Sequence, residues 1–524
     1  MNLLIKTFSL LLIFYFNLTI YANTTSNSQS SKTQNTKKQM YDKQFAQAIE
    51  YWFRGDVEKA KELMTAAADR GVKPAYWYSY ILTQDTKYLI LSAKNQGKRS
   101  LTDAAVALVN KTYPNTSFAD YMTAYNWYLA ATEEQLTEQA FVAMCNIGLM
   151  YFRGEGPLTA DYNKAMEWYQ KAADHLFPRA VREIGVKYCN MAAKTNNLSS
   201  KETFIGLGYS HFAMAALRGD ERAKNLMNQP TTIKMPIADK NFVEAIKIYF
   251  EAKKFDNEVI KMLKTAAEQK HLFANILLGD YYSNSDQKLA VKYHQVADKQ
   301  GSIYAKTRLA RISSSKERIK YCKELTNLGY KMWRHNYAGE LEKQGNTTEA
   351  YKIFQQNADA GDAHSQYRMF NLIWAKKIKD ISIFKGFTYL IESSKQHFGD
   401  AEVSMGSFLT RDLLQISPED SMTLLMKGII DGVTTAQMYD FALGDIADGF
   451  ACGYGVKKDA EYAKQICLER VKNKNTVGYL FLGLYYEKGV FGKPDIENAK
   501  KYYKLGADSG NESCAKALKR LNKK

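Results

Sequence analysis

Proline, long apolar runs and closely spaced histidines are all scarce in this 524-residue sequence. Its 8 prolines leave long stretches free of the residue that interrupts helices most strongly. After residue 22, the longest apolar runs, such as residues 478–486, are far shorter than the ~18 residues that a membrane-spanning helix needs. The chain is therefore predicted to be helical beyond its N-terminus, with no more than peripheral membrane contact.

The sequence also lacks the residue spacings of common catalytic and metal sites. No two histidines lie three or four positions apart, and neither H-E-x-x-H nor G-x-S-x-G occurs. Gly154-x-Gly156 and Gly453-x-Gly455 precede predicted helices without following strands, unlike the glycines of a nucleotide-binding loop. These absences predict a non-enzymatic protein with no catalytic residue, no cofactor and no metal.

Cysteine is too rare to form a disulfide framework. The six cysteines show no C-x-x-C spacing, and Cys322 and Cys467 fall inside helical patterns, where a small buried side chain is the usual role. Cys145 and Cys189 lie at nearly matching places in successive repeats, so a disulfide between them is a candidate pairing.

The first 22 residues have the layout of a secretory signal peptide. Lys6 supplies a positive charge, residues 8–20 are mostly apolar, and Ala22 is a small residue suited to the cleavage site. Residues 23–40 are almost entirely polar, so they cannot bury enough apolar surface to offset the entropy of folding. We expect a signal peptide at 1–22 and a disordered polar linker at 23–40; an uncleaved anchor is the alternative.

The formal net charge of +17 would suggest a nucleic-acid partner in a cytosolic protein. Predicted export argues against nucleic acid, so the lysine-rich surface is interpreted mainly as a solvated surface. Steering toward acidic partners or anionic envelope surfaces is the other interpretation.

A twelve-residue pattern recurs along the chain. It consists of a small residue, two variable residues, an aromatic or aliphatic residue, an aliphatic residue, two variable residues, two small residues, two variable residues and glycine. Positions 1, 4, 5 and 8 share one face of a helix, and the closing glycine suits the left-handed residue at which many helices end. Clear copies are residues 60–71, 86–97, 290–301, 318–329, 350–361 and 499–510, and looser copies begin near residues 124, 165, 208, 259, 386, 421 and 463.

A second pattern precedes several of these copies and predicts another helix followed by a turn. A small residue lies three positions before an aromatic one, as in Gly148 and Tyr151, so both share a helix face. A Gly-x-Gly turn follows, and then an aspartate such as Asp161 that can cap the next helix. The structural repeat positions predicted from both patterns are Gly148, Tyr151, Gly154, Gly156, Ala165, Trp168, Ala172, Gly279, Tyr282, Gly453, Gly455, Gly483, Tyr486, Gly489, Ala499 and Gly510.

The repeating unit is thus a helix–turn–helix pair, which can bury its apolar face only by stacking on its neighbours. This predicts an all-α fold, an α/α superhelical solenoid of about 12–13 repeats. We expect the solenoid to span residues 41–511 as a single curved rod with one continuous core and a concave surface. Residues 512–524 are predicted to form a basic C-terminal capping helix.

Residues 148–173 resemble the Sel1-like repeat, a relative of the tetratricopeptide repeat. The family pattern LGxxYxxGxG, then D, then KAxxWYxKAA is matched there almost position for position, and the last repeat matches it over residues 483–510. The resemblance covers most of residues 41–524 and implies a superhelix with adaptor or scaffold function. Exported bacterial members of this family are similar to proteins of intracellular pathogens. A eukaryotic member of the family serves in a degradation complex of the endoplasmic reticulum.

Together these observations predict an exported adaptor that binds a protein partner on its concave surface. We expect it in the bacterial periplasm or envelope or secreted, with a role in host interaction or virulence. A degradation adaptor in the lumen of the endoplasmic reticulum is one alternative, because six N-x-S/T sequons follow the signal peptide. A cell-wall or β-lactam hydrolase is the other, although this chain lacks the regular cysteine pairs of the family members linked to β-lactams.

Overall fold

The computed structural model describes residues 40–95, 101–112, 117–132, 137–378, 380–407, 413–472 and 475–522. Within these ranges the chain forms 28 α-helices and no β-strand, which confirms the predicted all-α class. No helix in these ranges has the length and apolarity needed to cross a membrane. The predicted signal peptide (1–22) and all but the last residue of the predicted linker (23–40) lie outside the described residues.

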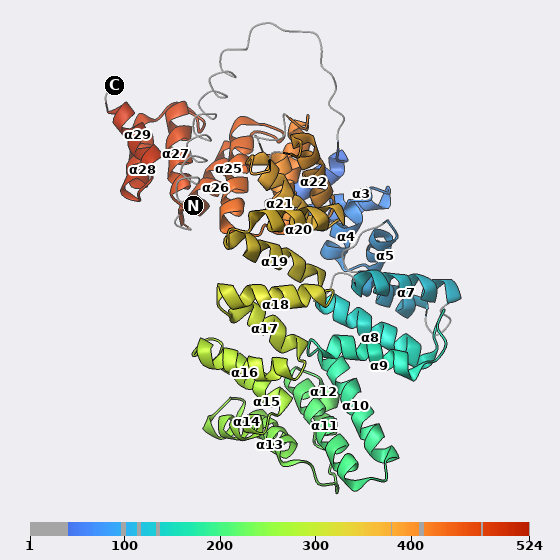
Figure 1. Cartoon of the computed structure of the whole chain (residues 1–524). Coiled ribbons are helices and arrows are strands. Elements are labelled where there is room, and N and C mark those ends of the chain that lie inside the picture. The colour runs from blue at the N-terminus through green and yellow to red at the C-terminus, as the bar shows by residue number, and fades with distance from the viewer. Residues whose placement is uncertain are drawn as a thin grey trace.

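Consecutive helices pack against one another as an α/α array, seen as a chain of helix pairs from blue to red in Figure 1. Their bounds are α2 (Lys43–Phe53), α3 (Val57–Asp69), α4 (Ala75–Thr83), α5 (Thr86–Lys94), α6 (Leu101–Thr112), α7 (Phe118–Thr132), α8 (Glu138–Arg153), α9 (Tyr162–Ala173), α10 (Pro178–Lys194), α11 (Leu198–Leu217), α12 (Glu221–Met227), α13 (Ile237–Ala252), α14 (Asn257–Glu268), α15 (Leu272–Tyr282), α16 (Gln287–Lys299), α17 (Ile303–Ile312), α18 (Ser315–Asn327), α19 (Lys331–Lys343), α20 (Thr347–Asp359), α21 (Ala363–Trp374), α22 (Ile383–Lys395), α23 (Gly399–Gly406), α24 (Pro418–Asp431), α25 (Ala436–Cys452), α26 (Ala460–Lys472), α27 (Thr476–Lys488), α28 (Ile496–Asp508) and α29 (Glu512–Leu521).

The two helices of a repeat approach closely because one of them carries a small residue at the contact. A Cβ atom on Gly148 of α8 would lie 3.2 Å from the Ala165 carbonyl oxygen and from the Tyr169 ring of α9. A Cβ on Gly279 of α15 would lie 2.6 Å from the imidazole of His294 on α16. The small residue on the first helix therefore makes room for the ring on the second.

The closing position of the twelve-residue pattern adopts left-handed backbone geometry in every copy that the structure describes. In this conformation the chain leaves the helix at its C-terminus and changes direction. Glycine adopts the conformation at little cost because it has no Cβ atom. Three copies close on residues other than glycine: Leu176, Lys270 and His397, with φ of 58°, 61° and 59°. The other described closing residues are Gly71, Gly219, Gly301, Gly329, Gly361, Gly432 and Gly510.

The non-glycine closing residues predict a stabilising substitution. Lys270 is exposed, so Lys270→Gly loses little side-chain contact. Holding a non-glycine residue in the left-handed region destabilises the folded state by roughly 1–2 kcal/mol, and glycine removes this strain. Glycine also increases the entropy of the unfolded chain, which offsets about half of the gain. We therefore expect Lys270→Gly to raise the free energy of unfolding by about 0.5–1 kcal/mol. Urea unfolding followed by circular dichroism measures this gain. The reverse change at the equivalent position, Gly301→Lys, should lower stability; equal stability in both variants would contradict the argument.

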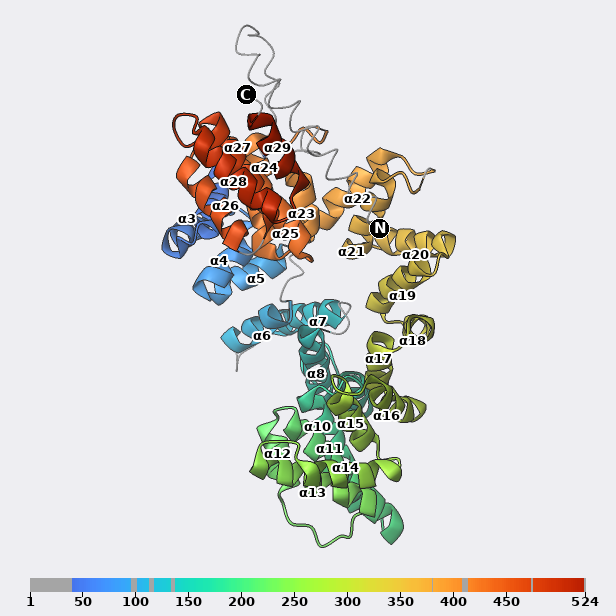
Figure 2. The ribbon, with the colours of Figure 1, turned by 90° about the vertical axis from the view of Figure 1, so that its left-hand side faces the viewer.

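The predicted curved array closes on itself, because its N-terminal end packs against repeats near its C-terminal end. Residues between 45 and 88 share one apolar cluster with residues between 403 and 485. The backbone N–H groups of Met40 and Tyr41 donate to the Asp420 carboxylate at 2.7 and 3.0 Å, and Arg54 pairs with Asp459 at 2.8 Å. Figures 1 and 2 accordingly show the blue helices α3–α5 beside the orange helices of the C-terminal part.

The array also touches itself near its middle. The turn between α9 and α10 meets the turn between α18 and α19, where His175 Nε2 lies 3.2 Å from the Tyr330 hydroxyl. Phe141 stacks on the His175 ring, with a centroid distance of 4.9 Å. Most of the described buried apolar residues form six clusters, and partly buried side chains such as Tyr151 and Trp168 pack against two of these clusters at once.

Candidate functional site

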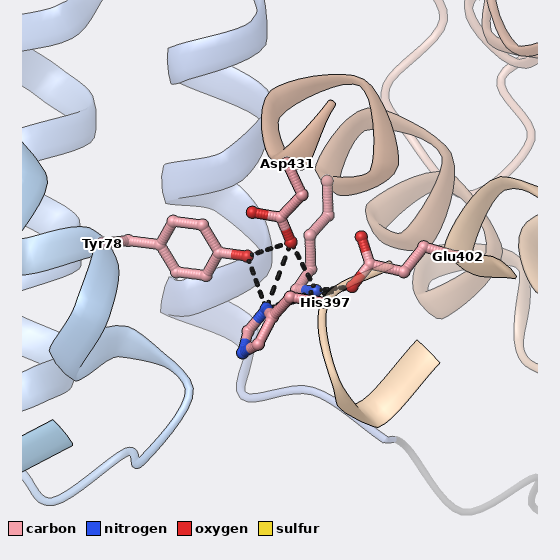
Figure 3. A network of polar contacts seen from close by, with 5 residues as sticks. Tyr78, His397, Glu402 and Asp431 are labelled. Carbon is pink, nitrogen blue, oxygen red and sulfur yellow. Dashed lines mark hydrogen bonds and ion pairs between the residues drawn. The ribbon is translucent and has the colours of Figure 1, made fainter. Parts of the chain in front are cut away.

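A buried polar network lies where the N-terminal helices meet α22–α24 (Figure 3). At its centre, the ammonium group of Lys427 donates to Glu402 and, at 3.1 Å, to Asp431 Oδ2. Tyr78, from α4, donates its hydroxyl hydrogen to the same Asp431 oxygen at 2.7 Å. His397 Nδ1 lies 3.1 Å from Asp431 Oδ2 and 3.2 Å from both the Tyr78 hydroxyl and Lys427 Nζ. The network therefore joins segments more than 300 residues apart.

Burial controls the protonation of this network. Lys427, Glu402 and Tyr78 are each 3% exposed or less, and only His397 reaches solvent, with about a quarter of its side chain (26%) exposed. Burial raises the pKa of Glu402 to about 8, although the nearby Lys427 ammonium acts in the opposite direction. Burial acts to lower the pKa of Lys427, but Glu402, Tyr78 and Asp431 outweigh it and hold that pKa well above its usual value. Burial thus favours the neutral form of Glu402, whereas the acidic groups around Lys427 favour its charged form.

Three of these residues also have the composition of a metal site. Ligand atoms of His397, Glu402 and Asp431 lie within 4.8 Å of one another, the one such group among the described parts of the chain. The Lys427 ammonium contacts all three residues and so already supplies the positive charge that a metal ion would bring. An ion would have to displace a buried lysine, so this arrangement fits a structural contact between distant repeats better than a metal centre.

Sequence reasoning did not identify this network, although one signal was present. His397 is the closing residue of the copy that begins at Gly386, where the pattern has glycine. Histidine enters the left-handed region more readily than most residues, and there its ring reaches Tyr78 and Asp431. A histidine in place of the repeat glycine was therefore one visible departure from the pattern, beside Leu176 and Lys270.

A solvent-filled groove of about 700 Å³ crosses α8, α9, α10 and the start of α12. We call it the arginine groove, because Arg153, Arg179, Arg182 and Arg222 line it. Arg182 is held between Glu183 and Asp220 at 2.6 and 3.0 Å.

Two exposed aromatic side chains lie at the α8–α9 end of this groove. Phe152 and Tyr162 are 54% and 43% exposed, and their ring centroids are 6.4 Å apart. Glu183, Asp220 and Glu221 also line the groove and offset part of its positive charge. The groove thus combines arginine side chains with aromatic surface, the residue types that contribute most to protein interfaces.

The predicted repeat positions are distributed along the array and form no common site. Gly148, Gly279 and Gly483 face the second helix of their repeats, and Ala165, Ala172 and Ala499 are fully buried. Tyr151, Trp168, Tyr282 and Tyr486 are partly buried in helix contacts. The turn glycines with positive φ are Gly154, Gly156, Gly453, Gly455, Gly489 and Gly510.

The candidate disulfide between Cys145 and Cys189 is not formed, because both residues are free thiols. Cys145 is buried among α8, α9 and the start of α10, where burial raises its pKa to about 12. Cys189 lies farther along α10 and faces Gly208 of α11, where a Cβ atom would lie 2.6 Å from the Cys189 sulfur. Matching places in successive repeats therefore do not bring the two sulfur atoms together.

The fold defines this chain as an all-α protein of stacked helix pairs. Its residues 43–72, 142–175 and 476–511 match the family model of the Sel1 repeat. These three segments are thus Sel1 repeats, as the resemblance predicted.

Two of the solved structures that the chain matches are of bacterial proteins. One is c5321, a protective antigen present in uropathogenic Escherichia coli strains that displays an SLR fold, with 17% identity, a TM-score of 0.45, and coverage of 84% of this chain and 90% of that one. Another is a Sel1 repeat protein from Oxalobacter formigenes, with 13% identity, a TM-score of 0.24, and coverage of 94% and 98%. No curated protein matches the sequence.

Proposed function

We propose that this protein is an exported, non-enzymatic scaffold that holds a segment of a protein partner in the arginine groove. The observation that carries the proposal is the groove itself, whose volume of about 700 Å³ suits a short peptide segment. Its exposed aromatic pair and its arginines supply the apolar and charged contacts that such a segment would use. A Sel1-repeat fold is consistent with work as a protein-interaction scaffold.

Export is part of the proposal and rests on the N-terminal sequence alone. We place the protein in the bacterial periplasm or envelope or outside the cell, with a role in host interaction; the lumen of the endoplasmic reticulum is the alternative. Cell fractionation with N-terminal sequencing tests this location. A mature N-terminus immediately after Ala22 in an exported fraction would support it, whereas an intact Met1 in the cytosol would contradict it.

The groove is tested with the double substitution Phe152→Ala and Tyr162→Ala. Both side chains are largely exposed, so we expect the fold to be retained and partner binding to weaken about tenfold or more. A photo-crosslinking residue at position 152 first identifies the partner in the native host, and binding of that purified partner is then measured with both variants. The matched control is Phe384→Ala, which removes a 79% exposed phenylalanine on α22, outside the groove. Equal binding by the double variant would contradict the proposal.

A further inference from the structure

A second pocket, of about 470 Å³, lies among α17, α18 and α19 at the same place in the repeat as the arginine groove. Each pocket is formed by the first helices of two successive repeats and by the second helix that lies between them. Arg179, Val186 and Asn190 follow the closing residue Leu176 by three, ten and fourteen positions. Met332, Gly339 and Lys343 follow the closing residue Gly329 by the same intervals and line the second pocket.

This second pocket, which we call the tryptophan pocket, is rich in hydrogen-bond donors. Trp333 is 3% exposed, and its indole N–H has no acceptor; the buried Nε of Arg318 also lacks one. A buried donor without an acceptor is costly, so such groups usually have a partner that completes them. Both nitrogen atoms are shielded from solvent, so they are unsatisfied within the wall of the pocket among the described residues.

The charge of the tryptophan pocket is positive. Arg311, Arg318 and Lys343 line it, and Glu340 is its one carboxylate. Glu340 is 5% exposed and already accepts from Lys343 at 2.7 Å and from Arg318 at 3.5 Å. The arrangement is therefore complementary to a ligand that brings a further negatively charged acceptor.

The pocket is open because of a glycine within a helix. A Cβ atom on Gly339 of α19 would meet nothing within 4 Å, whereas the equivalent Val186 places an isopropyl group in the arginine groove. Helical glycine is unfavourable by roughly 1 kcal/mol relative to alanine, so a larger residue here would improve helix propensity while filling the pocket.

The two pockets start beside the contact between His175 and Tyr330. Arg179 lies one helical turn after His175, and Met332 lies two residues after Tyr330.

We propose that the tryptophan pocket binds the carboxylate side chain of an acidic peptide segment, with the carboxylate paired with Arg311 and Lys343. This inference rests on the proposed function, because the segment belongs to the same protein partner. It adds a second site and the chemistry of its ligand.

The test is calorimetric titration of the full-length mature protein with three blocked octapeptides at physiological salt: (Glu-Leu)₄, (Gln-Leu)₄ and (Lys-Leu)₄. We expect the glutamate peptide to bind about tenfold or more tightly than the glutamine peptide, because charge-assisted hydrogen bonds are the stronger ones. Gly339→Leu fills the pocket without changing the net charge, and it should abolish this preference. Gln355→Leu, on an exposed position of α20, is the matched control and should retain it.

The inference is overturned if the glutamate and glutamine peptides bind equally, or if Gly339→Leu binds the glutamate peptide as well as Gln355→Leu does. If the arginine-groove variants bind the partner as tightly as the unmodified protein does, that result counts against the proposed function alone. The peptide titration measures binding in the tryptophan pocket directly.

Discussion

Replacing Lys427 with methionine is expected to release the N-terminal helices from the C-terminal repeats. The ammonium group is shared by Glu402 and Asp431, and without it a carboxylate remains buried without a counter-charge. Removing one partner of a buried ion pair costs about 3–5 kcal/mol, which corresponds to a hundredfold or greater change in the opening equilibrium. Hydrogen exchange of residues 43–83 measures this opening directly, because α2–α4 carry the contact.

The control for this prediction removes the carboxylates together with the lysine. The triple variant Lys427→Met, Glu402→Gln and Asp431→Asn leaves no buried charge at the centre of the network, so exchange in α2–α4 should slow again toward that of the unmodified protein. If Lys427→Met alone leaves exchange in α2–α4 unchanged, the network does not hold the two ends of the array together.

The attachment of the N-terminal helices is also expected to weaken as pH rises. Burial raises the pKa of Glu402 from its ordinary value of 4.5 to about 8 in the folded protein. The folded state therefore keeps a proton that the unfolded chain has lost, and its stability falls as pH rises from 4.5 toward 8. The loss between pH 5 and 8 is at most about 4 kcal/mol, since each unit of pKa shift corresponds to about 1.4 kcal/mol.

Glu402→Gln isolates this effect because glutamine stays neutral at every pH. We expect hydrogen exchange in α2–α4 to accelerate between pH 5 and 8 in the unmodified protein, after correction for the intrinsic pH dependence of exchange. The variant should show no such acceleration. The charged or titratable groups around Glu402 are Tyr41, Tyr78, His397, Asp420, Lys427 and Asp431, and all remain in both proteins. Parallel profiles for the two proteins would contradict the assignment of the proton to Glu402.

An opposing trend is expected below neutral pH, from histidines elsewhere in the array. Burial lowers the pKa of His175, His211 and His294 to about 4, so the folded state resists protonating them. Their contribution to stability is lost as pH falls from 6.5 toward 4. The unmodified protein and Glu402→Gln contain the same histidines. The difference between their hydrogen-exchange rates is therefore free of this trend.

The repeat was predictable because its determinants are local. Apolar residues at positions 1, 4, 5 and 8 lie on one face of a helix whatever the rest of the chain does, and the closing residue must leave that helix. Even the copies that end on Leu176, Lys270 and His397 keep the left-handed turn, because the helices before and after it fix the backbone. The pockets were not predictable, since each depends on the shape left between three helices.

The amino-acid sequence by itself determined the helix pairs, their turns and the Sel1 character of the repeat, because a single helical hairpin specifies each of them. Only the tertiary structure decided that the array meets itself, which brings Tyr78 to Asp431 and His175 to Tyr330. The physical reason is that small rotations between neighbouring repeats add up along the array, so the distance between remote repeats depends on all the packing contacts between them.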